Sequence, residues 1–251
     1  DPTTGKTADS AKAYNDAKKA AQEAIKEAET VIKDENATPE QVTEALNKVN
    51  EKKAALEKAK QALVEAATAE EKAKLKADAA QLTKANETGK TPDSIAAYEA
   101  AYEKLKSQLE EAKEAAAAVE AKGDNATKAK AQEAQAKVEA AKTALDKAAE
   151  LLVNKADKAE LTKAKEALSE LTTAADPTTG KTADSAKTYT DKKTAAEEAI
   201  KEAEAVINDE NATPEKVTEA LNKVNEKKEA LEAAKQALVE AATAEEKAKL
   251  K

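Results

Sequence analysis

A short stretch that occurs three times constrains this chain more than any other feature of its sequence. It consists of Thr-Gly-Lys-Thr, an Asp-Ser pair one residue later, and a Tyr four residues after the Ser. The copies start at Thr4, Thr88 and Thr179. Glycine suits the left-handed turn after a helix, whereas Asp and Ser are preferred helix N-caps. We therefore expect each copy to end one helix and to start the next, in a chain of repeated units.

The composition favours long helices. The chain has 251 residues, of which 65 are Ala, and it contains only 4 Gly and 5 Pro. Abundant Ala, Glu, Lys and Leu with helical periodicity are typical of long helices or coiled coils. Disorder is the competing interpretation for a chain in which 37% of the residues are charged. The helical patterning and the absence of Gly, Pro or Ser tracts argue against disorder.

Several classes of function have no support in the sequence. A net charge of −8 and the absence of Arg argue against nucleic acid as a partner. No apolar run is long enough for membrane insertion. Without His or Cys, and with its five Ser residues at caps or on helix faces, the chain offers no catalytic residue. We expect no enzyme activity, no cofactor and no metal. The missing Met and a start inside a turn predict a segment of a longer protein.

Apolar residues recur at helical spacing along each unit. The first long helix is expected from Asp9 or Ser10 to about Lys33. The second is expected to start at Thr38 and Pro39, because Thr is a good N-cap and Pro fits the first helical position. Its apolar residues follow at intervals of seven, at Val42, Val49, Leu56 and Leu63. The only aromatic residues, Tyr14, Tyr98, Tyr102 and Tyr189, are expected in the core or at its edge.

The apolar face changes sides between units. Leu63 and Leu75 are 12 residues apart, which turns the face by roughly 120° on a helix. Either one long helix passes from one bundle to the next, or a short break occurs near Thr68, which forms a capping-box pattern with Glu71. We favour the continuous helix because neither Gly nor Pro interrupts it. The same change recurs near residues 153–157.

The chain has an A–B–A organisation. Residues 176–251 repeat residues 1–76 with 10 differences, and all Val, Ile, Leu and Tyr positions are unchanged. The middle unit follows the same pattern more loosely. We expect a partial repeat at 1–76 with two long helices, and three-helix repeats at 77–153 and 154–251. The predicted fold class is all-α, with eight helices in tandem three-helix bundles that continuous or nearly continuous helices join into an elongated rod.

Three loop motifs are better explained by helix caps than by ligands. Gly-Lys-Thr resembles the end of a phosphate loop, but the earlier Gly and the preceding strand are absent. Asp34-Glu35-Asn36 and its twin at 209–211 lack the frame of an EF-hand calcium loop. The Asn-Ala-Thr triplets at 36–38, 125–127 and 211–213 fit a glycosylation sequon but lie at helix starts.

The expected site residues therefore serve the repeat turns and helix caps. They are Gly5, Asp9, Ser10, Thr38, Pro39, Gly89, Asp93, Ser94, Thr127, Gly180, Asp184, Ser185, Thr213 and Pro214.

The combined pattern resembles the FIVAR ("found in various architectures") family. A short Leu-bearing helix at 161–175, a Thr-x-x-Ser turn at 182–185, Asn-Ala-Thr-Pro-Glu at 211–215 and Val-x-x-Ala-Leu at 217–221 carry the resemblance. Residues 77–153 match it more loosely. The family often places an aromatic residue after the turn Ser, where this chain has Ala11, Ile95 and Ala186.

The resemblance implies three-helix bundles and a place in the surface proteins of Gram-positive bacteria. Such repeats are common in secreted, cell-wall-anchored proteins, including giant matrix-binding adhesins of staphylococci and streptococci. Our leading hypothesis is a monomeric stalk or spacer whose direct partners are neighbouring repeats. The alternative is a binding module for a host matrix or serum protein, or for a glycan. That alternative predicts an exposed apolar patch, whereas we expect Lys, Glu, Asp, Thr and Ala at the exposed positions.

Overall fold

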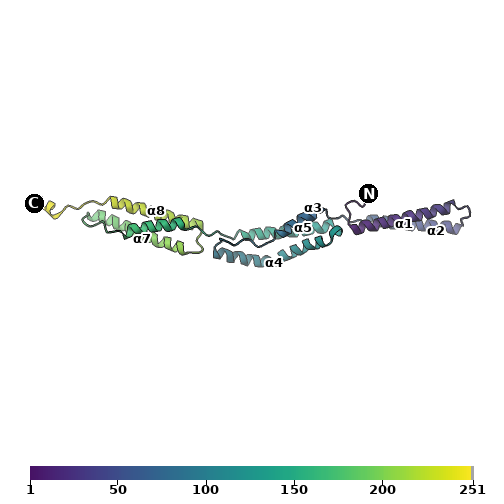
Figure 1. The fold of residues 1–251 in the computed structure, drawn as a ribbon, viewed down its shortest axis with the longest axis horizontal. Coiled ribbons are helices and arrows are strands. Elements are labelled where there is room, and N and C mark those ends of the chain that lie inside the picture. Colours follow the sequence, from purple (N-terminus) through teal and green to yellow (C-terminus); the bar gives the residue numbers. More distant parts are fainter. Residues whose placement is uncertain (250–251) are drawn as a thin grey trace. The chain divides into compact units, whose positions relative to one another are not determined.

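The computed structural model describes residues 1–249 and confirms the all-α fold (Figure 1). Eight of its helices match the predicted series, and a ninth, very short helix follows them within the described residues. In chain order, the helices are α1 (Ala8–Lys33), α2 (Pro39–Gln61), α3 (Ala69–Ala80), α4 (Pro92–Ala121), the 3-10 turn η1 (Gly123–Asn125), α5 (Lys128–Ala149), α6 (Ala159–Thr173), α7 (Ala183–Asn208), α8 (Pro214–Gln236) and α9 (Ala244–Ala248).

The chain divides into two compact units that share α4. Unit 1 comprises Asp1–Ala85 and Ala101–Ala148, and unit 2 comprises Asn86–Ala100 and Ala149–Lys251. The boundaries that we expect between repeats, at 76/77 and 153/154, remain a prediction, and the first of them falls inside α3.

Unit 1 contains a hairpin of α1 and α2 and a bundle of α3, α5 and most of α4. The bundle has a continuous core because the apolar stripes of its three helices face one another. Its buried residues are Ala67, Leu75, Leu82, Leu109, Ala112, Ala116, Val119, Ala126, Ala131, Ala134, Val138, Ala141 and Leu145. The hairpin, in contrast, buries only Ala21 and Ala24 on α1 and no residue on α2.

Unit 2 contains a bundle of α6, α7 and α8 (Figure 1). Small Ala side chains on α7 let the helices approach closely, and large aliphatic residues on α6 and α8 fill the remaining space. Its buried core consists of Leu161, Leu168, Tyr189, Ala196, Ala199, Ala203, Ala212, Val217, Val224, Leu231 and Ala234.

The predicted continuous helix between bundles is wrong at both places. α2 ends at Gln61 and α3 begins at Ala69, while α5 ends at Ala149 and α6 begins at Ala159. The main chain between these helices bonds to the repeat turns, so its N–H and C=O groups are not free for an i to i−4 ladder. A capping box of Thr68 and Glu71 then starts α3, as the alternative interpretation expected.

The Tyr side chains lie in the core or at its edge. Tyr98 and Tyr189 are buried, whereas Tyr14 and Tyr102 are half-buried. Tyr102 packs against the core of the unit 1 bundle, and Lys84 lies 6.0 Å from the centroid of its ring.

One expectation about the surface is wrong. Four large aliphatic side chains of the α1–α2 hairpin are exposed, with exposed fractions of 47% for Ile25, 81% for Ile32, 51% for Val42 and 59% for Leu46. The seven-residue pattern predicted burial because it does not reveal whether a third helix covers the hairpin.

Candidate functional site

The three repeat turns adopt the backbone conformation that glycine permits. Gly5, Gly89 and Gly180 have φ angles of +69°, +73° and +78°. A Cβ atom added at Gly5 or Gly89 would meet nothing within 4 Å, so the requirement for Gly comes from the positive φ and not from crowding.

Each turn pairs with the extended segment that follows the second long helix of its own repeat. In the first copy, the Thr7 N–H donates to the Val64 oxygen at 2.9 Å and the Ala66 N–H donates to the Gly5 oxygen at 3.0 Å. Lys6 and Glu65 form an antiparallel bridge between these bonds. Two short segments that are distant in sequence are therefore joined through main-chain groups.

The same pairing recurs in the other two copies. The Thr91 N–H donates to the Val153 oxygen and the Lys155 N–H to the Gly89 oxygen, both at 2.8 Å. In the third copy, the Thr182 N–H donates to the Val239 oxygen, and the Ala241 N–H donates to the Gly180 oxygen.

The N-cap position of the following helix differs from the prediction. Thr7 and Thr182 occupy the N-caps of α1 and α7, in place of the Asp9 or Ser10 and the Asp184 or Ser185 that we expected. The bond from the Thr N–H holds this residue extended, so the helix starts directly after it. Asp9 and Asp184 lie in the first helical turn, where a carboxylate complements the helix dipole.

The turn Ser residues connect the helix start to the extended segment. The Ser10 hydroxyl donates to the Thr7 oxygen at 3.1 Å and accepts from the Val64 N–H at 3.2 Å. Ser185 makes the same two contacts with Thr182 and Val239. Ser94 is buried, and its hydroxyl donates to the Thr91 oxygen at 2.8 Å.

After each of the first two turns, an Asn side chain from the next repeat caps the start of the following helix. Asn125 Oδ1 accepts the Asp9 N–H at 2.8 Å, although the two residues are 116 positions apart. Asn211 Oδ1 accepts the Asp93 N–H at 2.9 Å across 118 positions. The Thr7 side chain makes no capping hydrogen bond of its own, so Asn125 supplies the cap that α1 would otherwise lack.

These contacts define two junctions. The first junction comprises residues 3–10, 62–68 and 123–128 and lies in unit 1, whereas the second comprises residues 87–94, 150–158 and 207–214 and lies in unit 2. In the first junction, the Ala67 N–H donates to the Ala126 oxygen at 2.8 Å and the Lys128 N–H donates to the Glu65 oxygen at 2.9 Å. The extended segment is thereby bonded along both of its edges.

The second junction lacks this second pair of bonds. Pro214 stands where the first junction has Lys128, at the first position of the helix, and proline has no N–H to donate. Instead, the Lys158 ammonium donates to the Ile207 oxygen at 2.8 Å and to the Asp209 oxygen at 2.6 Å. At this junction the bonds of Thr91 and Lys155 to the other strand remain, and a side-chain cation contacts the loop of the next repeat where the first junction has its second main-chain pair.

The remaining predicted residues start the second helix of each repeat. Thr38 accepts from the Gln41 N–H in a complete capping box, and Pro39 is the first residue of α2. Thr213 likewise accepts from the Lys216 N–H at 3.4 Å, while Pro214 starts α8. Thr127 accepts from the Lys130 N–H at 3.2 Å.

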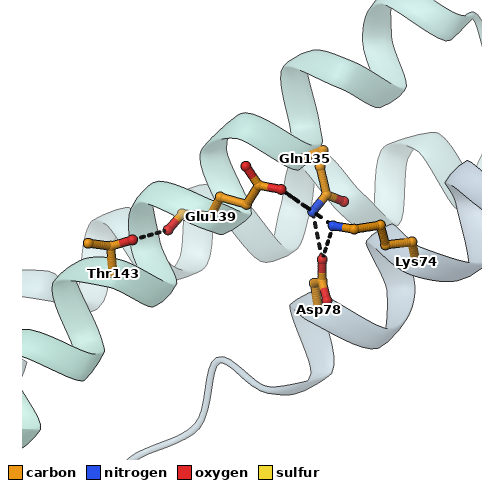
Figure 2. Close-up of polar contacts among 5 residues, drawn as sticks. All are labelled: Lys74, Asp78, Gln135, Glu139 and Thr143. Atoms are coloured by element: carbon orange, nitrogen blue, oxygen red, sulfur yellow. Dashed lines mark hydrogen bonds and ion pairs between the residues drawn. The ribbon is translucent and has the colours of Figure 1, made fainter.

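A polar network connects α3 to α5 in unit 1 (Figure 2). The Gln135 amide donates to Asp78 Oδ2 at 2.6 Å and to Glu139 Oε1 at 2.9 Å. The Lys74 ammonium lies 2.6 Å from Asp78 Oδ2 and 3.4 Å from Glu139 Oε1. Thr143 extends the network along α5, where its hydroxyl donates to the Glu139 main-chain oxygen.

The network stabilises both carboxylates in their charged form. The hydrogen bond from Lys74, followed by that from Gln135, lowers the pKa of Asp78 against the opposing effect of burial. The hydrogen bonds from Gln135 and then Lys74 lower the pKa of Glu139 in the same way. The pairs also fix α3 against α5, which suggests a structural role for these groups.

One groove and the distribution of possible metal ligands were compared with what a small-molecule or metal site requires. A groove of about 410 Å³ lies between the end of α4 and the start of α5, lined mainly by Ala115, Ala118, Val119 and Ala134 with Lys and Glu at its edges. Among residues 1–249, no three His, Cys, Asp or Glu side chains gather as metal ligands. None of the helices described is long and apolar enough to cross a membrane.

Sequence reasoning missed the residues that connect one repeat to the next. It places Asn125 and Asn211 in local caps and Val64 and Val153 in a helix, whereas the structure places all four at the junctions. One signal was available: Asn precedes the Ala-Thr pair in all three repeats, although Thr alone can cap the helix. The recurring Leu-Val pairs at 63–64, 152–153 and 238–239 were a second signal, because β-branched residues favour extended backbone.

Two comparisons relate the chain to known proteins. A sequence model of the FIVAR domain matches residues 1–57, 59–146 and 164–232, which together make up most of the chain. A solved structure from work on extracellular matrix binding protein (Embp)-mediated Staphylococcus epidermidis adherence to fibronectin is 33% identical. The match covers 65% of this chain and 98% of that one, with a TM-score of 0.37. The resemblance seen in the sequence is thus confirmed: the chain belongs to the FIVAR domain family.

Proposed function

We propose that this chain forms spacer repeats of a bacterial surface adhesin, which hold a ligand-binding domain away from the cell wall. The observation that carries the proposal is the first junction. There, one extended segment is bonded to the turn of its own repeat and to a loop of the next repeat.

Such a junction restricts how consecutive repeats can move. A flexible linker would leave its N–H and C=O groups to water, whereas residues 64–67 bond to protein on both edges. The Asn125 cap adds a contact between α1 and the loop that precedes α5. Because several bonds act at separate points, a change of angle between the repeats would require breaking more than one of them.

Small-angle scattering of the monomeric chain tests the proposal. A globule of 251 residues has a radius of gyration of about 18 Å. A spacer should give a clearly larger value and a maximum dimension on the order of 100 Å, as expected for helices laid end to end. A radius near the globular value would contradict the proposal, and sedimentation at the same concentration establishes whether the scattering particle is a single chain.

A binding assay separates a spacer from a matrix-binding module. Fibronectin is a suitable probe because the similar staphylococcal structure comes from work on adherence to fibronectin. A spacer should show no saturable binding to immobilised fibronectin, with an unrelated acidic helical protein as the control. Saturable binding above that control would favour the binding module instead.

A further inference from the structure

The groove between the two long helices is larger in the middle repeat than in the first. It has a volume of about 410 Å³ between α4 and α5, whereas its counterpart between α1 and α2 has about 170 Å³. The same positions line both grooves, with Val119 and Ala134 in one and Val31 and Ala45 in the other. The difference in volume therefore arises from the side chains that the two repeats place around a common floor.

In the other repeats, a Glu side chain of the first long helix pairs with a Lys of the second. The pairs are Glu27 with Lys48 between α1 and α2, and Glu202 with Lys223 between α7 and α8. Both Glu27 and Lys48 line the smaller groove. The middle repeat keeps the lysine as Lys137, but it has Ala115 in place of the glutamate. Within residues 1–249, Lys137 forms no hydrogen bond or ion pair.

The charge around the groove is also reversed. Five positions on the two helices and the first residue after α4 can be compared directly between the repeats. In the middle repeat they hold Ala115, Lys122, Lys130, Glu133 and Lys137. In the first repeat they hold Glu27, Asp34, Gln41, Glu44 and Lys48. The net charge at these positions is thus +2 in the middle repeat and −2 in the first, so only the larger groove attracts an anion.

The charge of Lys137 acts at the edge of the groove. The hydrogen bond and the charge of Lys130, followed by a smaller contribution from the charge of Lys137, lower the pKa of Glu133. Glu133 itself lines the groove. Lys137 therefore favours negative charge at this end of the groove.

The walls of the groove suit an alkyl chain better than an extended peptide. Around Ala115 and Ala134 both walls are α-helix, whose N–H and C=O groups bond within the helix. An extended peptide would leave its own main-chain groups without partners there, whereas an alkyl chain has none to satisfy. The volume of about 410 Å³ lies within the range of small-molecule sites.

We propose that the α4–α5 groove binds a linear amphiphile that consists of an alkyl chain and a terminal carboxylate. The alkyl chain contacts Ala115, Ala118 and Val119, and the carboxylate pairs with Lys137 as Glu27 pairs with Lys48 in the first repeat. This binding goes beyond the proposed spacer role and does not depend on it.

A titration of the complete chain with sodium decanoate, followed by methyl NMR, tests this site. The reporter is Val119, and its counterparts Val31 and Val206 are controls within the same sample. Val119 should shift in a saturable way with a dissociation constant of about 1 mM, as expected for a ligand of about a dozen non-hydrogen atoms. The two control Val residues should require at least about tenfold more decanoate. Decyltrimethylammonium, which has the same chain length and the opposite charge, should bind at least about tenfold more weakly than decanoate.

Two matched variants locate the binding site. Ala115→Glu restores the glutamate of the other repeats, which fills the groove and pairs with Lys137, so it should weaken decanoate binding at least about tenfold. Ala117→Glu also introduces a glutamate that the other repeats have, as Glu29 and Glu204, but Ala117 does not line the groove. This control should bind decanoate like the parent chain, and circular dichroism establishes that both variants keep their helix content.

Three results would overturn the proposal. Absence of a saturable shift at Val119 in the parent chain with about 10 mM decanoate would show that the groove does not accept this ligand. Equal binding of decanoate and decyltrimethylammonium would indicate adsorption of the alkyl chain without a carboxylate site. Equal losses in Ala115→Glu and Ala117→Glu would place the ligand outside the groove.

Discussion

At the scale of single residues, the junctions depend on side chains that act far from their own helix. Asn125 lies before α5 yet caps α1, whereas Thr7, the residue in the N-cap position, uses its hydroxyl to contact Ser10. The N-terminal amides of a helix have no partner within the helix, so an external acceptor satisfies them as well as a local one. This arrangement makes the stability of one repeat depend on a residue of another.

Replacement of this Asn should lower the free energy of unfolding only where the Asn side chain caps a helix. Asn125→Ala is expected to lower the free energy of unfolding by about 1 kcal/mol, the usual effect of removing an N-cap. Asn36→Ala is the matched control, because Asn36 occupies the same triplet and its side chain caps no helix start within residues 1–249. Urea unfolding followed by circular dichroism measures both variants, and equal losses would contradict the role of Asn125.

The sequence predicted the local caps of α2 and α8, but neither the Thr N-caps of α1 and α7 nor the distant Asn caps. Thr38 with Gln41 is a pattern within four residues, so propensity alone locates it. The contact between Asn125 and Asp9 spans 116 positions and depends on how two repeats are placed, which no local rule describes. The Gly positions were predictable for the same local reason, since positive φ is a property of the turn itself.

At the scale of elements, the short helix α3 is held by charged and polar groups as well as by its Leu residue. Its Lys72 donates to the Gly123 oxygen near the end of α4, and Lys74 and Asp78 join the network on α5 (Figure 2). The single fully buried side chain of the helix itself is Leu75. Ion pairs of this exposure contribute modestly, but here they act on a helix with little apolar area.

The network should make the attachment of α3 depend on pH. The pKa of Asp78 is lowered in the folded protein, so its contribution is present above the ordinary Asp value and is lost as the pH falls through the lowered value. Asp78→Asn should therefore destabilise the chain at pH 7, and the difference from the parent should shrink below about pH 4. Urea unfolding at both pH values measures this difference. If the difference in unfolding free energy between variant and parent is the same at both pH values, the carboxylate is excluded as its cause.

Removal of one main-chain N–H should weaken the attachment of the extended segment at the first junction. Lys128→Pro removes the N–H that bonds to Glu65 but suits the first position of α5, where Pro is well tolerated. We expect a loss of about 1 kcal/mol and faster hydrogen exchange at the Ala67 amide. Lys128→Ala keeps the N–H and should behave like the parent; if both variants exchange equally fast, the main-chain bond has no such role.

The break between α2 and α3 shows where pattern reasoning at this scale failed. Neither Gly nor Pro interrupts residues 40–88, so helix propensity favoured a continuous helix. The main-chain bonds to Thr7 and Gly5 compete with the helix and prevail at residues 62–67. Thr68 was a usable signal, because a capping box has no function in the middle of a helix.

At the scale of the whole molecule, the near-identical copies allow one fold to be compared in two surroundings. The bundle of α6, α7 and α8 has a continuous core, whereas α1–α2 buries only Ala21 and Ala24. Eight of the nine α-helices described in residues 1–249 were predictable from the sequence. The difference in burial arises from a third helix and not from the 10 substitutions, and it agrees with the expectation of only two long helices at 1–76.

This difference predicts unequal local stability within one chain. The Val49 amide on α2 should exchange at least about tenfold faster than the Val224 amide on α8, since local opening of α1–α2 exposes less apolar area. Both residues occupy the same position in nearly identical sequence, so intrinsic exchange rates cancel. Hydrogen exchange followed by NMR measures the ratio, and a ratio near one would contradict the inferred difference.

The main-chain pairing at the junctions has a consequence for the evolution of the gene. Because these joints depend mainly on main-chain groups, together with the turn Ser, one Asn at each and Lys158 at the second, most surface residues can diverge without separating the modules. Unequal recombination can then add or delete an A–B pair while every new joint finds its bonding partners. Under the proposed spacer role, the length of the array can thus be adjusted by copy number, without a new interface.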